Sequence, residues 1–275
     1  MKRYLMTPEC KAKLDRLKSI LEETGGCAVA YSGGVDSSLL LTVAYEVLGD
    51  RVLGVIATSS TYPEREFKRA IELAQEKNFP YVVINSEELD IEGFSENPAN
   101  RCYYCKKELF DKVLDQAHAK GLKWIADGTN ADDTGDYRPG MKAARELGVL
   151  SPLLDAGLTK DDIRTLLREV YKLDIADKPA MACLASRFPY GSAITKDKLK
   201  QVEKIEEFLE REGLRVFRAR HHGDIVRLEL GTDEMKAVMD NGLRNKITAF
   251  VKEQGFAYVT LDMEGYRTGS MNEVL

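Results

Sequence analysis

A loop near the N-terminus combines glycines, hydroxyls and one carboxylate in the order Ser32-Gly33-Gly34-Val35-Asp36-Ser37. The apolar residues 27–31 precede it, and an apolar helical pattern follows at 38–48. Paired glycines allow a tight turn that brings backbone N–H groups close to an anion, and a helix N-terminus adds partial positive charge. The loop lacks the Gly-Lys-Ser/Thr ending of Walker-type loops. It therefore suits a pyrophosphate group held by backbone amides, with Asp36 as a ligand for Mg²⁺.

A second polar loop, Asp127-Gly128-Thr129-Asn130-Ala131-Asp132-Asp133, follows an apolar stretch at 123–127. Ligands of parallel sheets bind at the carboxyl ends of the strands, so we expect both loops at one edge of a sheet. Alone, the second loop could be only a turn. Beside the first loop it predicts contact with a nucleotide through Gly128, Thr129 and Asn130. Thr58, which ends another strand pattern, is a weaker candidate for the wall around adenine or ribose.

Three cysteines form a third candidate site, which would hold a metal. Cys102 and Cys105 are three residues apart at the start of a helical pattern, and Cys183 lies in the segment 180–187. A Cys-x-x-Cys pair alone suits zinc, a redox pair or an iron–sulfur cluster. A four-ligand zinc site needs one more ligand, and none of the three histidines is spaced to supply it. Three thiolates would leave one iron of a [4Fe–4S] cluster open to exogenous sulfide.

Composition limits the setting in which these sites act. The 275 residues are 44% hydrophobic and 31% charged, which is typical of a soluble globular protein with one or two domains. No apolar run approaches the ~20 residues of a membrane span. The net charge of −5 argues against a surface that binds nucleic acid. Five cysteines favour reduced thiols and a cytoplasmic location, with Cys10 and Cys27 expected to pack in the core.

Short apolar strands alternate with helices in the first part of the chain. Strand patterns at 27–31, 51–57, 81–84 and 123–127 alternate with helical patterns at 9–24, 38–48, 64–78 and 105–120. This alternation predicts an α/β fold with a doubly wound parallel sheet that is covered by helices on both faces. The edge that carries the two polar loops is where such a fold binds its ligand.

The pattern changes after residue 190. A charged helix at 196–212 is followed by strands at 214–219 and 224–230, a helical stretch at 232–252 and a strand at 258–261. We therefore predict two domains: residues 1–190 for ATP, and a smaller α/β domain at 191–275 for substrate binding or oligomerisation. Arg218 and Arg220 stand two residues apart, on one face of a strand, and Arg267 follows the last strand. Arginine forks suit phosphate oxygens, although any one of the three could equally form an ordinary surface salt bridge.

The first loop, in its strand–loop–helix context, resembles the signature of the PP-loop ATP pyrophosphatase superfamily, which includes NAD and GMP synthetases, asparagine synthetase and tRNA thiolases. This resemblance implies cleavage of ATP between the α and β phosphates, adenylation of a substrate oxygen and release of pyrophosphate. It also implies that the Gly-Thr-Asn loop lies beside the nucleotide.

Further motifs narrow the resemblance to LarE-type sulfur transferases. Arg-Cys-Tyr-Tyr-Cys-Lys at 101–106, Asp-Gly-Thr-Asn at 127–130, Cys-Leu-Ala-Ser-Arg at 183–187 and Arg-Ala-Arg-His-His-Gly-Asp at 218–224 are spread over nearly the whole chain. The family implies that a carboxylate of pyridinium-3,5-biscarboxylic acid mononucleotide is adenylated and that sulfur then displaces AMP, during synthesis of the nickel-pincer nucleotide cofactor.

The resemblance also assigns roles to individual residues. Some members of the family have only the cysteine that corresponds to Cys183 and sacrifice its sulfur, leaving dehydroalanine. The version with three cysteines is expected to bind a cluster through Cys102, Cys105 and Cys183 and to turn over repeatedly. Ser186 and Arg187 adjoin Cys183 and could orient the substrate, and Glu206 is carried over from the family as a catalytic residue. Family members tend to be homo-oligomers.

Three other functions compete with this hypothesis. A PP-loop tRNA thiolase can also use three cysteines and a cluster, but it should carry a basic RNA-binding module, which the charge balance does not supply. An ammonia-using synthetase has no evident use for the three cysteines. A non-enzymatic ATP sensor with a structural metal would release no pyrophosphate in response to an acceptor nucleotide. The sequence leaves the sulfur donor open.

Overall fold

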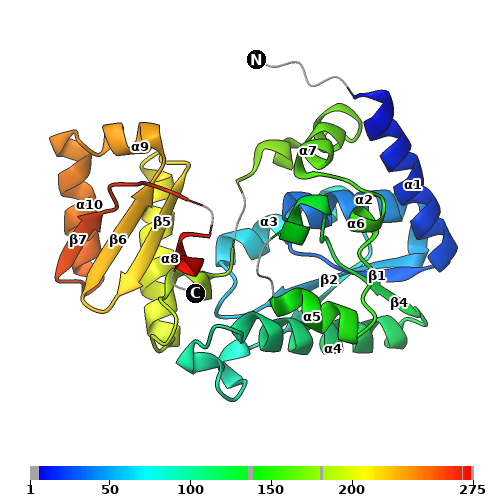
Figure 1. The fold of residues 1–275 in the computed structure, drawn as a ribbon, viewed down its shortest axis with the longest axis horizontal. Coiled ribbons are helices and arrows are strands. Elements are labelled where there is room, and N and C mark those ends of the chain that lie inside the picture. Colours follow the sequence, from blue (N-terminus) through cyan, green and yellow to red (C-terminus); the bar gives the residue numbers. More distant parts are fainter. Residues whose placement is uncertain (1–5, 136–138, 180–181, 268, 274–275) are drawn as a thin grey trace. The chain divides into compact units, whose positions relative to one another are not determined.

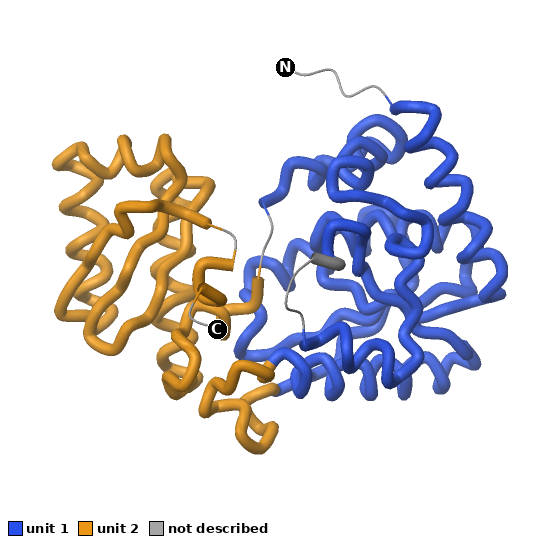
Figure 2. The backbone as a smooth tube through the Cα atoms, in the orientation of Figure 1, with its two compact units in different colours: residues 1–87, 102–181 blue, residues 88–101, 182–275 orange. Residues whose placement is uncertain are grey.

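The computed structural model describes residues 6–135, 139–179, 182–267 and 269–273. The chain forms two compact units, shown in different colours in Figure 2. The first unit comprises residues 1–87 and 102–181, and the second comprises residues 88–101 and 182–275. The chain therefore changes unit three times. The expected division into domains at residue 190 stays a prediction.

The first unit is built on a four-stranded sheet, labelled in Figure 1. Its order is β3 (Tyr81–Asn85), β2 (Val52–Thr58), β1 (Cys27–Ala30) and β4 (Trp124–Ala126). All three pairings are parallel. The chain runs outward from β1 to β3 and then returns to place β4 on the other side of β1. The topological switch point between β1 and β4 is where a doubly wound sheet binds its ligand.

Helices cover both faces of this sheet, because successive strand residues point to opposite sides. Val29 and Ile56 belong to one hydrophobic cluster, and their neighbours Ala28 and Val55 belong to the other. Helices that contribute to the first cluster are α1 (Pro8–Thr24), α2 (Val35–Leu48), α3 (Glu64–Glu76), α6 (Pro152–Asp155) and α7 (Lys160–Glu169). Helices α4 (Arg101–Ala119) and α5 (Pro139–Glu146) contribute to the second. The prediction of a doubly wound α/β fold is confirmed.

The second unit contains a smaller three-stranded sheet. Strand β5 (Phe217–His222) pairs antiparallel with β6 (Ile225–Leu230), and β6 pairs parallel with β7 (Tyr258–Leu261). Helix α8 (Lys196–Arg211) packs on β5, and α9 (Thr232–Ala237) and α10 (Asn241–Glu253) connect β6 to β7. Two short 3₁₀ helices at 88–90 and 94–96 also belong to this unit, and a further 3₁₀ helix covers Leu184–Arg187.

Several predicted boundaries are wrong. Helix α2 begins at Val35 rather than at 38, so Asp36 and Ser37 lie in its first turn. Helix α4 begins at Arg101, which places both Cys102 and Cys105 inside it. Strand β5 begins at Phe217 rather than at 214. The single helix expected over 232–252 is interrupted, because the Asp240 side chain accepts hydrogen bonds from two backbone amides and starts α10 there.

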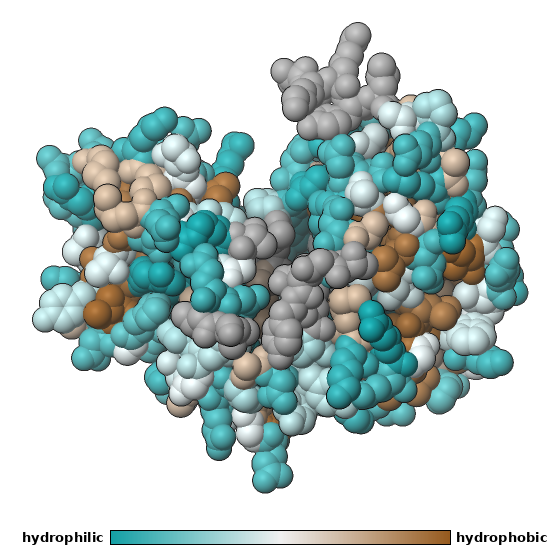
Figure 3. Space-filling model, viewed as in Figure 1, coloured by the Kyte–Doolittle hydropathy of each residue, from teal (hydrophilic) through white to brown (hydrophobic). Residues whose placement is uncertain are grey.

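The described surface carries mixed polarity. The face drawn in Figure 3 is mostly hydrophilic, with apolar residues in small groups. Within the described part of the chain, no helix has the length and apolar character needed to cross a lipid bilayer.

Candidate active site

The loop between β1 and α2 has the geometry of an anion cradle. Gly34 is the N-cap of α2, and no side chain caps the helix, so the backbone N–H groups of its first turn lack intrahelical acceptors. Gly33 has φ +60°, and a Cβ there would lie 2.7 Å from the Cβ of Ala70 on α3. Only glycine fits this position. The loop can therefore offer amides and helix-dipole charge to a phosphate group.

Protein donors already engage the carbonyl oxygens of this loop. The Tyr62 hydroxyl donates to the Ser32 oxygen at 2.6 Å, and Lys178 Nζ donates to the Gly33 oxygen at 2.8 Å. The Ser37 hydroxyl donates to the Gly34 oxygen at 3.3 Å. Lys178 is itself paired with the buried carboxylate of Glu66 at 2.5 Å. These bonds fix the backbone and leave its amides as the groups available to an anion.

The second polar loop lies directly against the first turn of α2. A Cβ on Gly128 would lie 3.0 Å from the Ser37 backbone nitrogen and 3.2 Å from the Cβ of Asp36. Asn130 Nδ2 lies 3.4 Å from Asp36 Oδ1. Thr129 donates to the largely buried Asp127 carboxylate at 2.7 Å, which shapes the loop. The structure thus brings together the two loops that the sequence singled out.

Lys160 is a residue of this site that the sequence did not reveal. Its ammonium group lies 2.5 Å from Asp36 Oδ1 and also donates to Oδ2. Its backbone nitrogen donates to Asp132 at 2.8 Å, which fixes the start of α7 against the second loop. Burial raises the pKa of the Asp36 carboxyl above its usual value, and the nearby Lys160 charge opposes that rise. Because 124 positions separate the two residues, no local spacing could have linked them.

The other hydroxyls named from the sequence lie in different surroundings. Thr58 ends β2 at the same edge of the sheet, and its carbonyl accepts from the Ser86 nitrogen at 2.9 Å. Ser38 is completely buried, so its hydroxyl cannot contact a bound phosphate.

Cys102 and Cys105 occupy the first two turns of α4 in the first unit, and both are half-buried. Helix α5 covers this part of α4, because a Cβ on Gly140 would lie 2.8 Å from Lys106 Cγ and 3.4 Å from the Cys102 oxygen. The Tyr103 hydroxyl also donates to Glu146 of α5 at 2.6 Å. The pair of thiols is therefore held on a braced helix.

Cys183 lies in the second unit, at the start of the 3₁₀ helix Leu184–Arg187. Its carbonyl accepts from the Ser186 backbone nitrogen at 3.0 Å, the Ser186 hydroxyl at 2.8 Å and Arg187 Nη1 at 3.1 Å. In contrast, Cys10 and Cys27 are buried, and burial raises the pKa of the Cys27 thiol to about 12. Among the described residues, no three His, Cys, Asp or Glu side chains converge as a metal site requires.

A buried ion pair supports the Cys183 segment. Arg187 is fully buried, and its Nε and Nη2 lie 2.9 Å and 2.8 Å from the two carboxylate oxygens of Glu206, which is 1% exposed. Burial alone would lower the pKa of Arg187, but the Glu206 carboxylate raises it above its usual value. Burial alone would likewise raise the pKa of Glu206, but Arg187 lowers it. Both groups are therefore charged near neutral pH, and Arg187 acts on the loop rather than at its surface.

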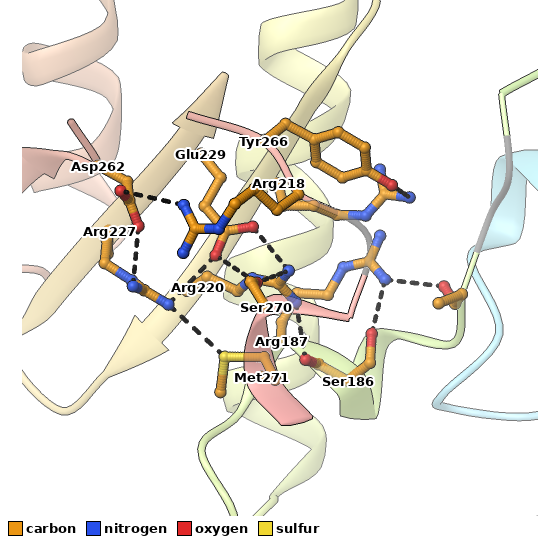
Figure 4. A network of polar contacts seen from close by, with 12 residues as sticks. Ser186, Arg187, Arg218, Arg220, Arg227, Glu229, Asp262, Tyr266, Ser270 and Met271 are labelled. Atoms are coloured by element: carbon orange, nitrogen blue, oxygen red, sulfur yellow. Dashed lines mark hydrogen bonds and ion pairs between the residues drawn. The ribbon is translucent and has the colours of Figure 1, made fainter. Parts of the chain in front are cut away.

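Two further arginines extend this network, which Figure 4 shows. Arg220 donates to the Ser186 oxygen at 2.9 Å, to Glu229 at 2.7 Å and to Ser270 at 3.0 Å. Arg218 lies over the Tyr266 ring, 5.0 Å from its centroid. Burial and the like charge of Arg187 lower the pKa of Arg218. Three arginines thus face two glutamates, and the surplus positive charge beside Ser186 suits an anionic ligand.

Comparison with known proteins places the chain among enzymes. It is 35% identical over 260 residues to the pyridinium-3,5-bisthiocarboxylic acid mononucleotide synthase of Lactiplantibacillus plantarum, covering 94% of this chain and 93% of the relative. The chain belongs to the LarE-type sulfurtransferase family. An uncharacterized protein of Synechocystis sp. is 38% identical over 265 residues, which cover 96% of this chain and 98% of that protein. The NAD synthase family profile matches residues 9–112.

A more distant relative shares the scaffold. A glutamine-hydrolyzing GMP synthase of Thermoplasma volcanium is 27% identical over 216 residues, which cover 72% of this chain and 68% of that protein. Membership in the LarE-type family confirms the resemblance drawn from the motifs. The protein is a sulfur-transferring synthase built on the PP-loop fold.

In this LarE-type chain, Arg267 has different surroundings from Arg218 and Arg220. It pairs with Glu264 at 3.0 Å and with Glu273 at 3.1 Å, both on the surface. His221 stacks on Phe188, with ring centroids 5.0 Å apart, and burial lowers its pKa. The roles assigned to Arg267 and to the other site residues stay predictions.

Proposed function

We propose that this enzyme uses MgATP to adenylate a carboxylate of pyridinium-3,5-biscarboxylic acid mononucleotide and then replaces AMP with sulfur. In the first step the carboxylate oxygen bonds to the α-phosphorus, and the bond to the β-phosphate oxygen breaks to release pyrophosphate. In the second step a sulfide-level sulfur bonds to the acyl carbon, and the C–O bond to AMP breaks. The product is a thiocarboxylate for nickel-pincer cofactor synthesis.

The observation that carries this proposal is the uncapped start of α2, packed against the 127–133 loop. Its free amides, at residues 34–37, would hold the pyrophosphate portion of ATP. Carboxylate oxygens are the ligands that Mg²⁺ prefers, so Asp36 fits a metal-binding role. Metal binding would then release Lys160 from Asp36 toward a phosphate oxygen. Magnesium balances phosphate charge when it is bound.

The substrate also carries a nucleotide phosphate, which needs its own cationic site. Ser186, Arg218 and Arg220 meet in the second unit, where the arginines outnumber the glutamates. Arginine forks match phosphate oxygens. We assign the substrate phosphate to this cluster, with Arg187 and Glu206 holding its frame rather than touching the ligand.

Sulfur delivery falls to the three half-buried cysteines. The donor set fits an iron–sulfur cluster, because Cys102 and Cys105 lie one turn apart on α4 and Cys183 adds a third partly exposed thiol. A [4Fe–4S] cluster held by these three residues would supply an open iron for sulfide. The alternative for the same site is that Cys183 gives up its own sulfur and becomes dehydroalanine.

The deciding experiment supplies anaerobically reconstituted enzyme with MgATP, the biscarboxylate nucleotide and sulfide. We expect AMP and pyrophosphate in equal amounts together with the thiocarboxylate, measured by mass spectrometry. Reconstituted protein should be brown, with about four irons per chain. Pyrophosphate release that does not depend on the acceptor nucleotide would contradict the proposal. Colourless protein with stoichiometric zinc would overturn its cluster.

The cellular setting follows from the same reasoning. We propose a cytoplasmic homo-oligomer that acts on a small nucleotide, with no membrane or nucleic-acid partner. A shift of tRNA mobility by the purified protein at physiological salt would instead favour a tRNA thiolase.

A further inference from the structure

Residues 94–101, which lead into Cys102, are anchored to the segment that follows Cys183. Asn97 is fully buried and has φ +58°, in the left-handed region. Its Nδ2 donates to the carbonyl oxygens of Pro189 at 2.7 Å and Phe188 at 3.2 Å. Its own carbonyl accepts from the Gly191 nitrogen at 2.9 Å. One asparagine thus satisfies three backbone groups of the 188–191 segment.

Arg101 completes this anchor with a buried charge. It is only 4% exposed, it donates to Asn97 Oδ1, and its guanidinium lies 4.8 Å from the centroid of the Tyr190 ring. Among the described residues it has no acidic partner, and its Nε is buried without a hydrogen-bond acceptor. Burying a cation in this way costs free energy that an apolar side chain would not. A feature that opposes stability indicates a purpose other than packing.

Both cysteine segments begin at this anchor. Arg101 is covalently followed by Cys102, and Phe188 is five residues after Cys183, whose carbonyl Arg187 also binds. We propose that Asn97 and Arg101 are positioning residues that hold the Cys102 and Cys183 segments in register, so that both present thiols to one sulfur centre. This inference rests on the proposed three-cysteine site and assigns two residues that set its geometry.

The test measures thiol proximity in the metal-free protein, so it does not depend on enzyme activity. Dibromobimane becomes fluorescent when it bridges two thiols, and peptide mass spectrometry identifies which thiols are joined. Asn97→Gly removes the amide but keeps the left-handed backbone accessible. Asn97→Asp keeps an acceptor for Arg101 and loses both donors. Arg101→Lys keeps the charge and loses the planar group over Tyr190.

The matched control is Asn78→Gly, because Asn78 also has a left-handed backbone (φ +56°) but is exposed. The bridge between Cys102 and Cys105 is an internal control, because both lie on α4. We expect Asn97→Gly to slow bridging of Cys183 to either partner about tenfold, the equivalent of about 1.4 kcal/mol. Bridging of Cys102 to Cys105 should not change. Asn97→Asp and Arg101→Lys should slow the Cys183 bridge in the same way.

Two outcomes would overturn the inference in different ways. If Cys183 bridges as fast in the three variants as in the wild type, the positioning role is wrong and the three-cysteine site survives. If wild-type protein forms the Cys102–Cys105 bridge but none to Cys183, the shared centre fails and the positioning role fails with it. Iron content after reconstitution gives a second readout, and we expect it to fall in Asn97→Gly but not in Asn78→Gly.

Discussion

Replacing Glu206 with glutamine should destabilise the second unit selectively. The substitution preserves shape and one acceptor oxygen but removes the negative charge that faces Arg187 at 2.8 Å and 2.9 Å, where the two side chains are 1% and 0% exposed. Removing one partner of such a pair leaves an uncompensated buried cation, which costs about 3–5 kcal/mol. The Glu206 carboxylate also accepts from the Ala219 nitrogen of β5, so the loss should extend to the sheet.

Two optical signals separate the units in this measurement. The chain has one tryptophan, Trp124, which lies on β4 of the first unit, so its fluorescence reports that unit. Circular dichroism reports helices of both units. Urea unfolding has a slope of about 1–3 kcal/mol per molar. We therefore expect the second-unit part of the dichroism transition to fall by about 1–3 M urea, while the Trp124 transition stays in place.

The pH dependence gives the sign of the same effect. The pKa of Glu206 is lowered in the folded state, so the ion pair contributes stability above the unfolded-state pKa, and that stability is lost as the pH falls through the folded-state pKa. The difference between wild type and Glu206→Gln should be largest near neutral pH and should shrink below about pH 4.5, the ordinary value for glutamate.

Controls on the same unit decide the interpretation. Asp233→Asn breaks an exposed ion pair with Lys236 and should leave the transition unchanged. Replacing Arg187 and Glu206 together with methionine should recover much of the stability, because the buried charges leave as a pair. A single Glu206→Gln variant that unfolds at the wild-type urea concentration would refute the assignment of a buried, charged pair.

Three predictions concern activity. Cys183→Ala should abolish thiocarboxylate formation yet leave acceptor-dependent pyrophosphate release intact, and loss of the adenylated intermediate would contradict its role in sulfur transfer. Asp36→Asn should slow pyrophosphate release first, and an unchanged rate at limiting Mg²⁺ would remove Asp36 from the metal site. Lys160→Met should lower the rate of adenylation about 10²-fold without changing the iron content of reconstituted protein, and equal loss in both assays would indicate a folding defect instead.

Local patterns were enough to predict the first sheet. The β1 and β2 strands are short and apolar on both faces, as buried parallel strands must be, and their alternation with helices set the fold class. Boundaries failed where capping decides them. Helix α2 starts at Val35 because Gly34 turns the backbone, and the break before α10 depends on one side chain, Asp240. Residues 88–101 belong to the second unit, which no periodicity could reveal.

The candidate site divides in the same way. The two loops could be predicted because each is a continuous run of residues at the end of a strand. Lys160, Tyr62 and Lys178 could not, because each reaches the β1–α2 loop from a distant part of the sequence. Glu206 shows the opposite limit. A helix pattern assigns it to the exposed side, whereas its partner Arg187 draws it inside.

The buried charges of the second unit are concentrated around the two segments that carry the sulfur chemistry. Arg187 fixes the Cys183 carbonyl, and Arg101 lies directly before Cys102. Apolar side chains of similar volume would stabilise a core at least as well, but they could not bind carbonyl oxygens in a fixed direction. A thiol that must attack or deliver sulfur depends on angstrom-level placement of its backbone. We infer that this unit gives up part of its stability in exchange for that placement.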